Sequence, residues 1–158
     1  MKKFLVLVVM LCAVMISSTA SAEADWIKVG SDKYITVWVD SNSISLDRNY
    51  YTNYIIRASV KIVYTDEGRQ REIERYRSNG KPLPKEIYNL SHDIDLFCFK
   101  DATDSIKCFD CLKQVSYTHN GATIPDMSFS RRKPKWTIIL PDTIIEKIFD
   151  SIITRISK

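Results

Sequence analysis

The clearest pattern of apolar and polar positions lies near the end of the chain, between residues 144 and 156. Apolar side chains recur there at intervals of three and four residues, which places them on one face of a helix: Ile144, Ile145, Ile148, Phe149, Ile152, Ile153 and Ile156. Thr143, with Glu146 three residues later, matches a capping box, so we expect the helix to begin there. Because β-branched isoleucine is a mediocre helix former, this helix needs an apolar surface to pack on.

Alternation of apolar and polar positions, typical of half-buried strands, fills most of the remaining chain. We expect strands at 26–29, 34–40, 50–64, 94–99, 106–117 and 136–140. Asn120-Gly121 is a tight-turn pair, and Asn79-Gly80 is a suitable end for a short, charged helix near 67–78. The pattern predicts an α+β fold with a single antiparallel sheet of about five or six strands. The C-terminal helix should pack on one face, which we expect to be that of Ile35, Val37, Val39, Ile94, Leu96 and Ile106.

The first 22 residues have the organisation of a secretory signal peptide. Two lysines precede a short apolar run, and Ala20-Ser21-Ala22 forms a cleavage site of the A-x-A type. We therefore expect a signal peptide at 1–22 and a single α+β domain at 23–158. Cleavage near Ala22 would leave a secreted, periplasmic or cell-surface protein. Since Lys2 and Lys3 are the only charged residues in this segment, the net charge would fall from +4 to +2, which does not favour nucleic-acid binding.

Three cysteines lie outside the predicted signal peptide, and export favours their oxidation. Cys98 and Cys108 would face each other across a hairpin if Lys100 paired with Ile106, so we expect a disulfide between these two cysteines. A Cys98–Cys111 bridge would be offset along the strands and would need a bulge. Cys111 is then left buried or available for an intermolecular bridge.

No arrangement of residues in the sequence indicates catalysis, a metal or a cofactor. The four glycines are not clustered, so a phosphate-binding loop is disfavoured, and zinc would need a fourth ligand beside the cysteines. Asp93 and Asp95 share a strand face, but no second acidic segment is evident, and we interpret them as a solvated strand start. We expect a protein that is not an enzyme.

The best candidates for ligand binding are basic. Arg131, Arg132, Lys133 and Lys135 form a cationic loop beside Trp136, suited to sulfated glycans or other anionic surfaces. Lys158 at the end of the given chain offers an ammonium and a carboxylate together, the pair that plasminogen's lysine-binding modules recognise.

The order of short motifs resembles the surface-adhesin protein E-like family of small exported bacterial proteins. The matching segments include Trp26-Ile-Lys-Val29, Val60-Lys-Ile-Val-Tyr64, Tyr88-Asn-Leu90, Ile94-Asp-Leu96 and Pro141-Asp-Thr143 before the terminal helix. The resemblance covers nearly all of residues 23–158. It implies an antiparallel sheet with the C-terminal helix packed on it, and a surface protein that binds host extracellular-matrix proteins and plasminogen.

An alternative is a self-associating structural protein of the cell envelope with no host ligand. Phe97, Phe99, Phe109 and Cys111 would lie on the strand faces opposite Cys98, which makes this hairpin apolar on both sides. One side can receive the helix. The face of these four residues would then be available for a homodimer.

Overall fold

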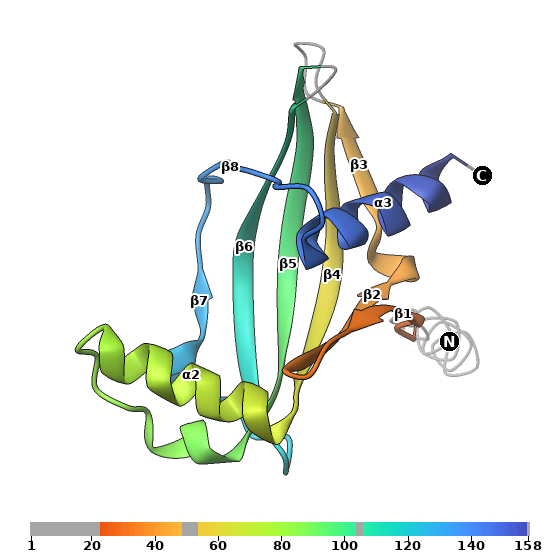
Figure 1. Ribbon diagram of the computed structural model, residues 1–158. Helices are drawn as coiled ribbons and strands as arrows, with labels where there is room; N and C mark the ends of the chain where they lie inside the picture. The colour runs from red at the N-terminus through yellow and green to blue at the C-terminus, as the bar shows by residue number, and fades with distance from the viewer. Residues whose placement is uncertain (1–22, 49–53, 104–105, 158) are drawn as a thin grey trace, which may run out of the picture.

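The structure is a computed structural model that describes residues 23–48, 54–103 and 106–157 (Figure 1). Its strands are β1 (Trp26–Ser31), β2 (Ile35–Asp40), β3 (Ser45–Arg48), β4 (Tyr54–Tyr64), β5 (Leu90–Thr103), β6 (Ile106–Thr118), β7 (Phe129–Ser130) and β8 (Thr137–Ile138). The α-helices are α2 (Asp66–Ser78) and α3 (Ile144–Ile156), and short 3-10 turns occupy Ser41–Ser43, Lys85–Asn89 and Pro125–Met127.

The strands form one antiparallel sheet, so the predicted α+β fold is confirmed. The order is β1-β2-β4-β5-β6-β7, with β3 also paired to β4 and β8 to β6. The sheet has eight strands rather than about five or six because three short pieces, β3, β7 and β8, add to the edges of longer strands. Both helices lie in front of the sheet in Figure 1, with α3 across the middle of the strands and α2 across their lower end.

Helix α3 begins where its sequence predicts. The Thr143 hydroxyl accepts a hydrogen bond from the Glu146 backbone N–H at 3.2 Å. The Glu146 carboxylate in turn accepts one from the Asp142 backbone N–H at 2.8 Å, so the reciprocal bond reaches one residue further than in the standard capping box. Arg155 lies in the last turn, where a cation interacts favourably with the helix dipole.

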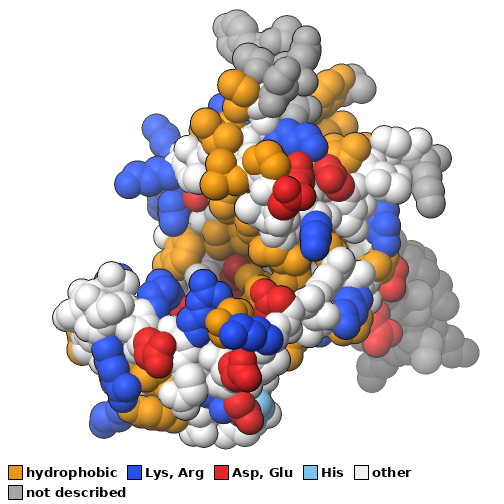
Figure 2. All heavy atoms as spheres, in the orientation of Figure 1, with side chains coloured by type: hydrophobic (Ala, Val, Ile, Leu, Met, Phe, Trp, Pro, Cys, Tyr) orange, Lys and Arg blue, Asp and Glu red, His pale blue; other side chains and the backbone are white. Residues whose placement is uncertain are grey.

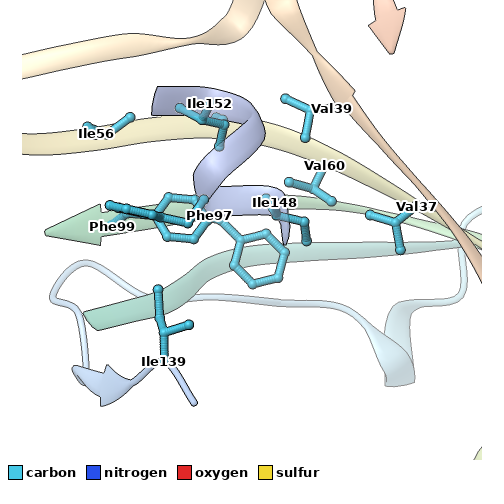
Figure 3. Packing of buried hydrophobic residues seen from close by; sticks show 11 residues of the cluster. Val37, Val39, Ile56, Val60, Phe97, Phe99, Ile139, Ile148 and Ile152 are labelled. Atoms are coloured by element: carbon cyan, nitrogen blue, oxygen red, sulfur yellow. The ribbon is translucent and has the colours of Figure 1, made fainter. Parts of the chain in front are cut away.

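The main core lies between α3 and the sheet (Figure 3). Ile148, Phe149 and Ile152 are the buried residues of the helix, and Phe149 packs on Phe99 with 5.7 Å between ring centroids. The sheet contributes Val37, Val39, Ile56, Ala58, Val60, Phe97 and Phe99, and Ile139 closes one side. Burying each large apolar side chain is worth about 1.5–3 kcal/mol, so this contact holds α3 in place.

Pairing across the sheet corrects the predicted face for this helix. Val39 pairs with Val60, and Val60 pairs with Asp95, so these three side chains share one face. Ile94 and Leu96 therefore point to the opposite face, and Ile106 is 41% exposed. The prediction was right for Ile35, Val37 and Val39 of β2. It assigned the wrong face to Ile94 and Leu96 of β5, because pairing with β4 decides which side chains of β5 face the helix.

Helix α2 forms a second, smaller core at the lower end of the sheet. Ile73 is its buried apolar residue, and it belongs to a cluster with Ile87, Leu90, Ile124 and Met127. Gly68 lies so close to the strand connection that an added Cβ would be 2.0 Å from the Tyr34 carbonyl oxygen. Only glycine, which has no Cβ, fits this close approach. The absence of a side chain at Gly68 thus allows α2 to lie near the sheet.

No helix within the described ranges is long and apolar enough to cross a membrane. The predicted signal peptide at 1–22 lies outside the described residues.

Candidate functional site

Two buried carboxylates on β5 form the most unusual polar feature of the fold. Asp93 is 1% exposed and Asp95 5% exposed, and both lie on the sheet face that also holds the main core. Their partners on β6 are Ser116 and Gln114. We call Asp93 and Asp95 the acidic pair. The interpretation as a solvated strand start was wrong, because both residues are almost entirely buried.

The two carboxylates differ in their hydrogen bonds. Asp93 Oδ2 accepts from the Tyr64 hydroxyl at 2.7 Å and from the Gln114 side-chain amide at 2.8 Å. The Oδ1 atoms of Asp93 and Asp95 are both buried without a hydrogen-bond partner. A buried polar atom without a partner is costly, so the acidic pair is an exception to the usual satisfaction of buried groups.

Burial shifts the protonation of the acidic pair. It raises the pKa of Asp95 to about 8, and the neighbouring Asp93 carboxylate adds to this shift. Burial also raises the pKa of Asp93, although hydrogen bonds from neighbouring side chains oppose the rise. The pKa of the Tyr64 hydroxyl is raised as well, by burial and then by Asp93. At neutral pH Asp95 is therefore largely protonated.

The acidic pair lies on a face that is hollowed between the two helices. Figure 2 shows the hollow between the lower part of the molecule, built by α2, and the upper part with α3; apolar and acidic side chains lie inside it. A pocket of about 270 Å³ opens beside α2 and is lined by Asp32, Tyr34, Ile35, Gly68, Arg71, Glu72 and Arg75. Ile35, in the wall of this pocket, pairs with Tyr64, which hydrogen-bonds to Asp93.

The sequence contained a weak indication of this site. Asp93 and Asp95 alternate with Ile94 in a strand whose neighbours are apolar. Acidic residues that alternate with apolar ones fit a solvent-facing strand surface equally well, so alternation alone could not reveal burial. Tyr64 and Gln114 come from β4 and β6, and only strand pairing brings them to Asp93.

The cationic loop lies at the edge of the sheet, between β7 and β8. Asp110, which is 7% exposed, anchors the loop: it accepts a hydrogen bond from the Lys135 backbone N–H at 2.8 Å and pairs with the Arg131 guanidinium at 3.3 Å. The side chains of Arg132, Lys133 and Lys135 are exposed. Of the four predicted loop residues, Arg131 therefore has a structural contact, and the other three are free to meet a ligand. Lys158 lies outside the described residues.

The predicted disulfide is not formed. Cys98 pairs with Asp110 and Cys108 with Lys100, so the two cysteines are offset by two residues instead of facing each other. The hairpin extends further than expected, to a pairing of Thr103 with Ile106, and this shifts the register. Cys98, Cys108 and Cys111 are all free thiols. Burial raises the pKa of Cys98, and burial followed by the Asp95 charge raises that of Cys111 to about 12, so both thiols are poor nucleophiles.

The face proposed for a homodimer is largely covered within the chain. Phe97, Phe99, Phe109 and Cys111 do share one face opposite Cys98, as predicted. Helix α3 packs on this face, leaving Phe97 only 4% and Phe99 0% exposed. These two phenylalanines are thus unavailable to a partner.

Within the described residues, no group of three or more His, Cys, Asp or Glu side chains is arranged to hold a metal ion. His92 points to the face opposite the acidic pair, where it stacks on Tyr117 with 4.9 Å between ring centroids. His119 lies beside the Arg69 guanidinium, with 2.9 Å between Nε2 and the nearer nitrogen.

No protein-family model, curated protein or solved structure matches this chain. The resemblance to the surface-adhesin protein E-like family therefore stays a prediction.

Proposed function

We propose that this protein is an exported, non-enzymatic binding module that recognises anionic macromolecules, sulfated glycans first, through the loop at 131–135. The observation that carries the proposal is the anchoring of this loop. Asp110 holds one end by its contact with Arg131 and the other by the Lys135 backbone N–H. Three exposed cations are thereby held in a short, ordered segment, which lowers the entropy lost on binding.

The surroundings of the loop also suit a glycan. Trp136 follows the loop and stacks beneath the Lys100 ammonium, 4.6 Å from its ring centroid, so a fourth cation lies beside the loop. Aromatic rings next to cations offer a flat apolar surface together with charge. Matrix proteins and plasminogen, the ligands that the resemblance implies, would meet this same surface.

The test is binding to immobilised heparin at increasing NaCl. We expect the variant with Arg132, Lys133 and Lys135 changed to alanine to bind about tenfold more weakly. Three exposed contacts of about 0.5 kcal/mol each amount to about 1.5 kcal/mol, and about 1.4 kcal/mol corresponds to a tenfold change in affinity. Arg131 is retained because it anchors the loop to Asp110. Matrix proteins and plasminogen are assayed with the same variant.

A matched control removes three other exposed cations, Arg77, Lys81 and Lys85, at and after the end of α2. This control has the same net charge as the loop variant. If both variants lose heparin binding equally, the interaction depends on net charge alone and the assignment to the loop is wrong. Unchanged binding in the loop variant contradicts it too.

A second candidate is self-association in the cell envelope. It is favoured by the other sheet face, on which neither helix of the described structure packs and where Trp38, Ile94, Leu96 and Val115 are only partly buried. Light scattering at increasing protein concentration tests it: a rising mass supports self-association, and a constant monomer mass argues against it.

A further inference from the structure

We propose that the hollow at the acidic pair binds the protonated head of an aliphatic amine, with the Asp95 carboxylate as its acceptor and the Asp93 carboxylate as the neighbouring charge. This site is separate from the cationic loop and takes a ligand of opposite charge.

The first argument is the missing donor at Asp95. Asp95 is only 5% exposed, yet its Oδ1 atom has no hydrogen-bond partner. Asp93 Oδ1 is in the same state, although Oδ2 of that residue receives two donors. The arrangement thus offers two unused acceptors at neighbouring positions of one strand face. An ammonium group has three N–H donors, enough to meet more than one acceptor.

The second argument is the lack of a cation. The ion pairs of the described residues involve Asp47, Asp66, Glu72, Asp150 and Asp110, and none of them involves the acidic pair. The titratable neighbours are Tyr64 on β4, Cys111 on β6 and Glu72 on α2, each neutral or acidic. Two cations of α2 are engaged elsewhere: Arg75 is held by Glu72 through two hydrogen bonds from its guanidinium, and the Arg71 guanidinium lies over the Tyr34 ring. A bound cation would supply the charge that the protein lacks here.

The third argument favours an amine over a metal ion. The described residues have no group of three carboxylate, histidine or cysteine ligands, whereas divalent cations require several oxygen ligands. Ile62 pairs with Asp93, and it gives the same face an apolar side chain against which methylene groups can pack.

Proton release should accompany binding. Because burial raises the pKa of Asp95 to about 8, the free protein at pH 7 has a protonated Asp95. An ammonium that binds there forms an ion pair with the carboxylate, and the carboxyl proton leaves to solvent. Affinity should therefore rise about tenfold per pH unit below pH 8 and level off above it.

The experiment is calorimetric titration of the full chain, as recovered from the producing cell, with n-butylamine at pH 6, 7 and 8. A single buried ion pair gives affinity of the millimolar order, so titrations extend to about 10 mM amine. We expect tighter binding at each higher pH and release of nearly one proton per amine at pH 7, measured in two buffers of different ionisation enthalpy. n-Butanol, which has the same shape without charge, should give no heat.

The matched variants are Asp95→Asn and, as a control, Asp126→Asn at an exposed carboxylate. Asp95→Asn should lower amine affinity at least tenfold and abolish proton release, whereas Asp126→Asn should leave both unchanged. Putrescine and Nα-acetyl-lysine amide then distinguish a free polyamine from a lysine side chain as the source of the ammonium. Thermal melts confirm that each variant is folded.

Three results would overturn the proposal. The first is the absence of binding by any amine at pH 8. The second is amine binding that Asp95→Asn leaves unchanged. The third is binding of Ca²⁺ or Mg²⁺ without binding of amines. None of these results bears on heparin binding by the loop, so the two proposals fail independently.

Discussion

One face of one strand contains the two most different environments of this molecule. Phe97 and Phe99 of β5 lie under α3 in the main core, and Asp93 and Asp95, on the same face, form the acidic pair. All four side chains are at least 95% buried. The apolar half is satisfied by packing, and the acidic half retains buried oxygen atoms without partners.

The two halves of this strand face therefore have different requirements. The phenylalanines need only apolar neighbours of the right shape, which α3 supplies. The carboxylates need donors; among the described residues Asp93 receives two, whereas the buried Oδ1 of Asp95 has no partner. A buried polar group without a partner is a candidate for binding, because a ligand that supplies the missing hydrogen bond would offset its desolvation free energy.

The largest expected effect comes from placing a charge in the apolar half. Ile148→Asp should lower the free energy of unfolding by more than about 4 kcal/mol, because Ile148 is 1% exposed and its neighbours offer no hydrogen bonds. Urea unfolding measures this loss. The control is Ile138→Asp, at a position that is 58% exposed, which should change stability by less than about 0.5 kcal/mol. A cooperative transition at the original urea midpoint in Ile148→Asp would show that α3 does not dock as described.

In the acidic half, removal of a charge should raise the free energy of unfolding. The raised pKa of Asp95 means that its ionisation opposes folding, so the wild-type protein should lose stability as the pH rises from about 4 to 8. Below pH 4 both the folded and unfolded states are protonated, and the penalty is absent. Asp95→Asn cannot ionise and should be more stable than the wild type by about 3 kcal/mol at pH 8, with little difference at pH 4.

Urea unfolding at both pH values checks this result. Asp126→Asn, at an exposed position, serves as the control and should follow the wild-type pH dependence. Equal stability of wild type and Asp95→Asn at pH 8 would mean that Asp95 ionises without penalty.

The contact of α2 with the sheet closes the acidic half from below, and Gly68 controls it. Gly68→Ala should cost about 2 kcal/mol, because the new Cβ would lie 2.0 Å from a backbone oxygen that cannot move aside easily. Thermal unfolding measures the loss. Gln70→Ala, at an exposed position of the same helix, should be nearly neutral; a similar loss there would point to helix propensity instead of the close approach.

The smallest expected effect concerns the Tyr64 hydroxyl, which donates to Asp93 of the acidic pair. Tyr64→Phe removes the 2.7 Å hydrogen bond to Asp93 and should cost about 1.5 kcal/mol at neutral pH. The loss should shrink at acidic pH, where Asp93 is protonated and needs the donor less. Tyr54→Phe, at a position that is 52% exposed, is the matched control. A loss independent of pH would indicate that the hydroxyl contributes by packing alone.

The sequence by itself determined the two helices and the long strands of this fold. The spacing of isoleucines placed α3 at 144–156, and Thr143 with Glu146 marked its start. Asn79-Gly80 follows α2 directly, and Gly80 adopts the left-handed conformation expected of a helix stop. These predictions succeeded because helix periodicity and caps depend on residues within a few positions of each other.

Only the tertiary structure decided which side of β5 meets the helix and where the cysteines lie. A strand pattern repeats every two residues, so its two faces are distinguished only by the partner strand. Pairing of Asp95 with Val60 turned Asp93 and Asp95 inward, and pairing of Lys100 with Cys108 separated Cys108 from Cys98. The acidic pair, with donors from β4 and β6, therefore depends on contacts between strands that no local pattern records.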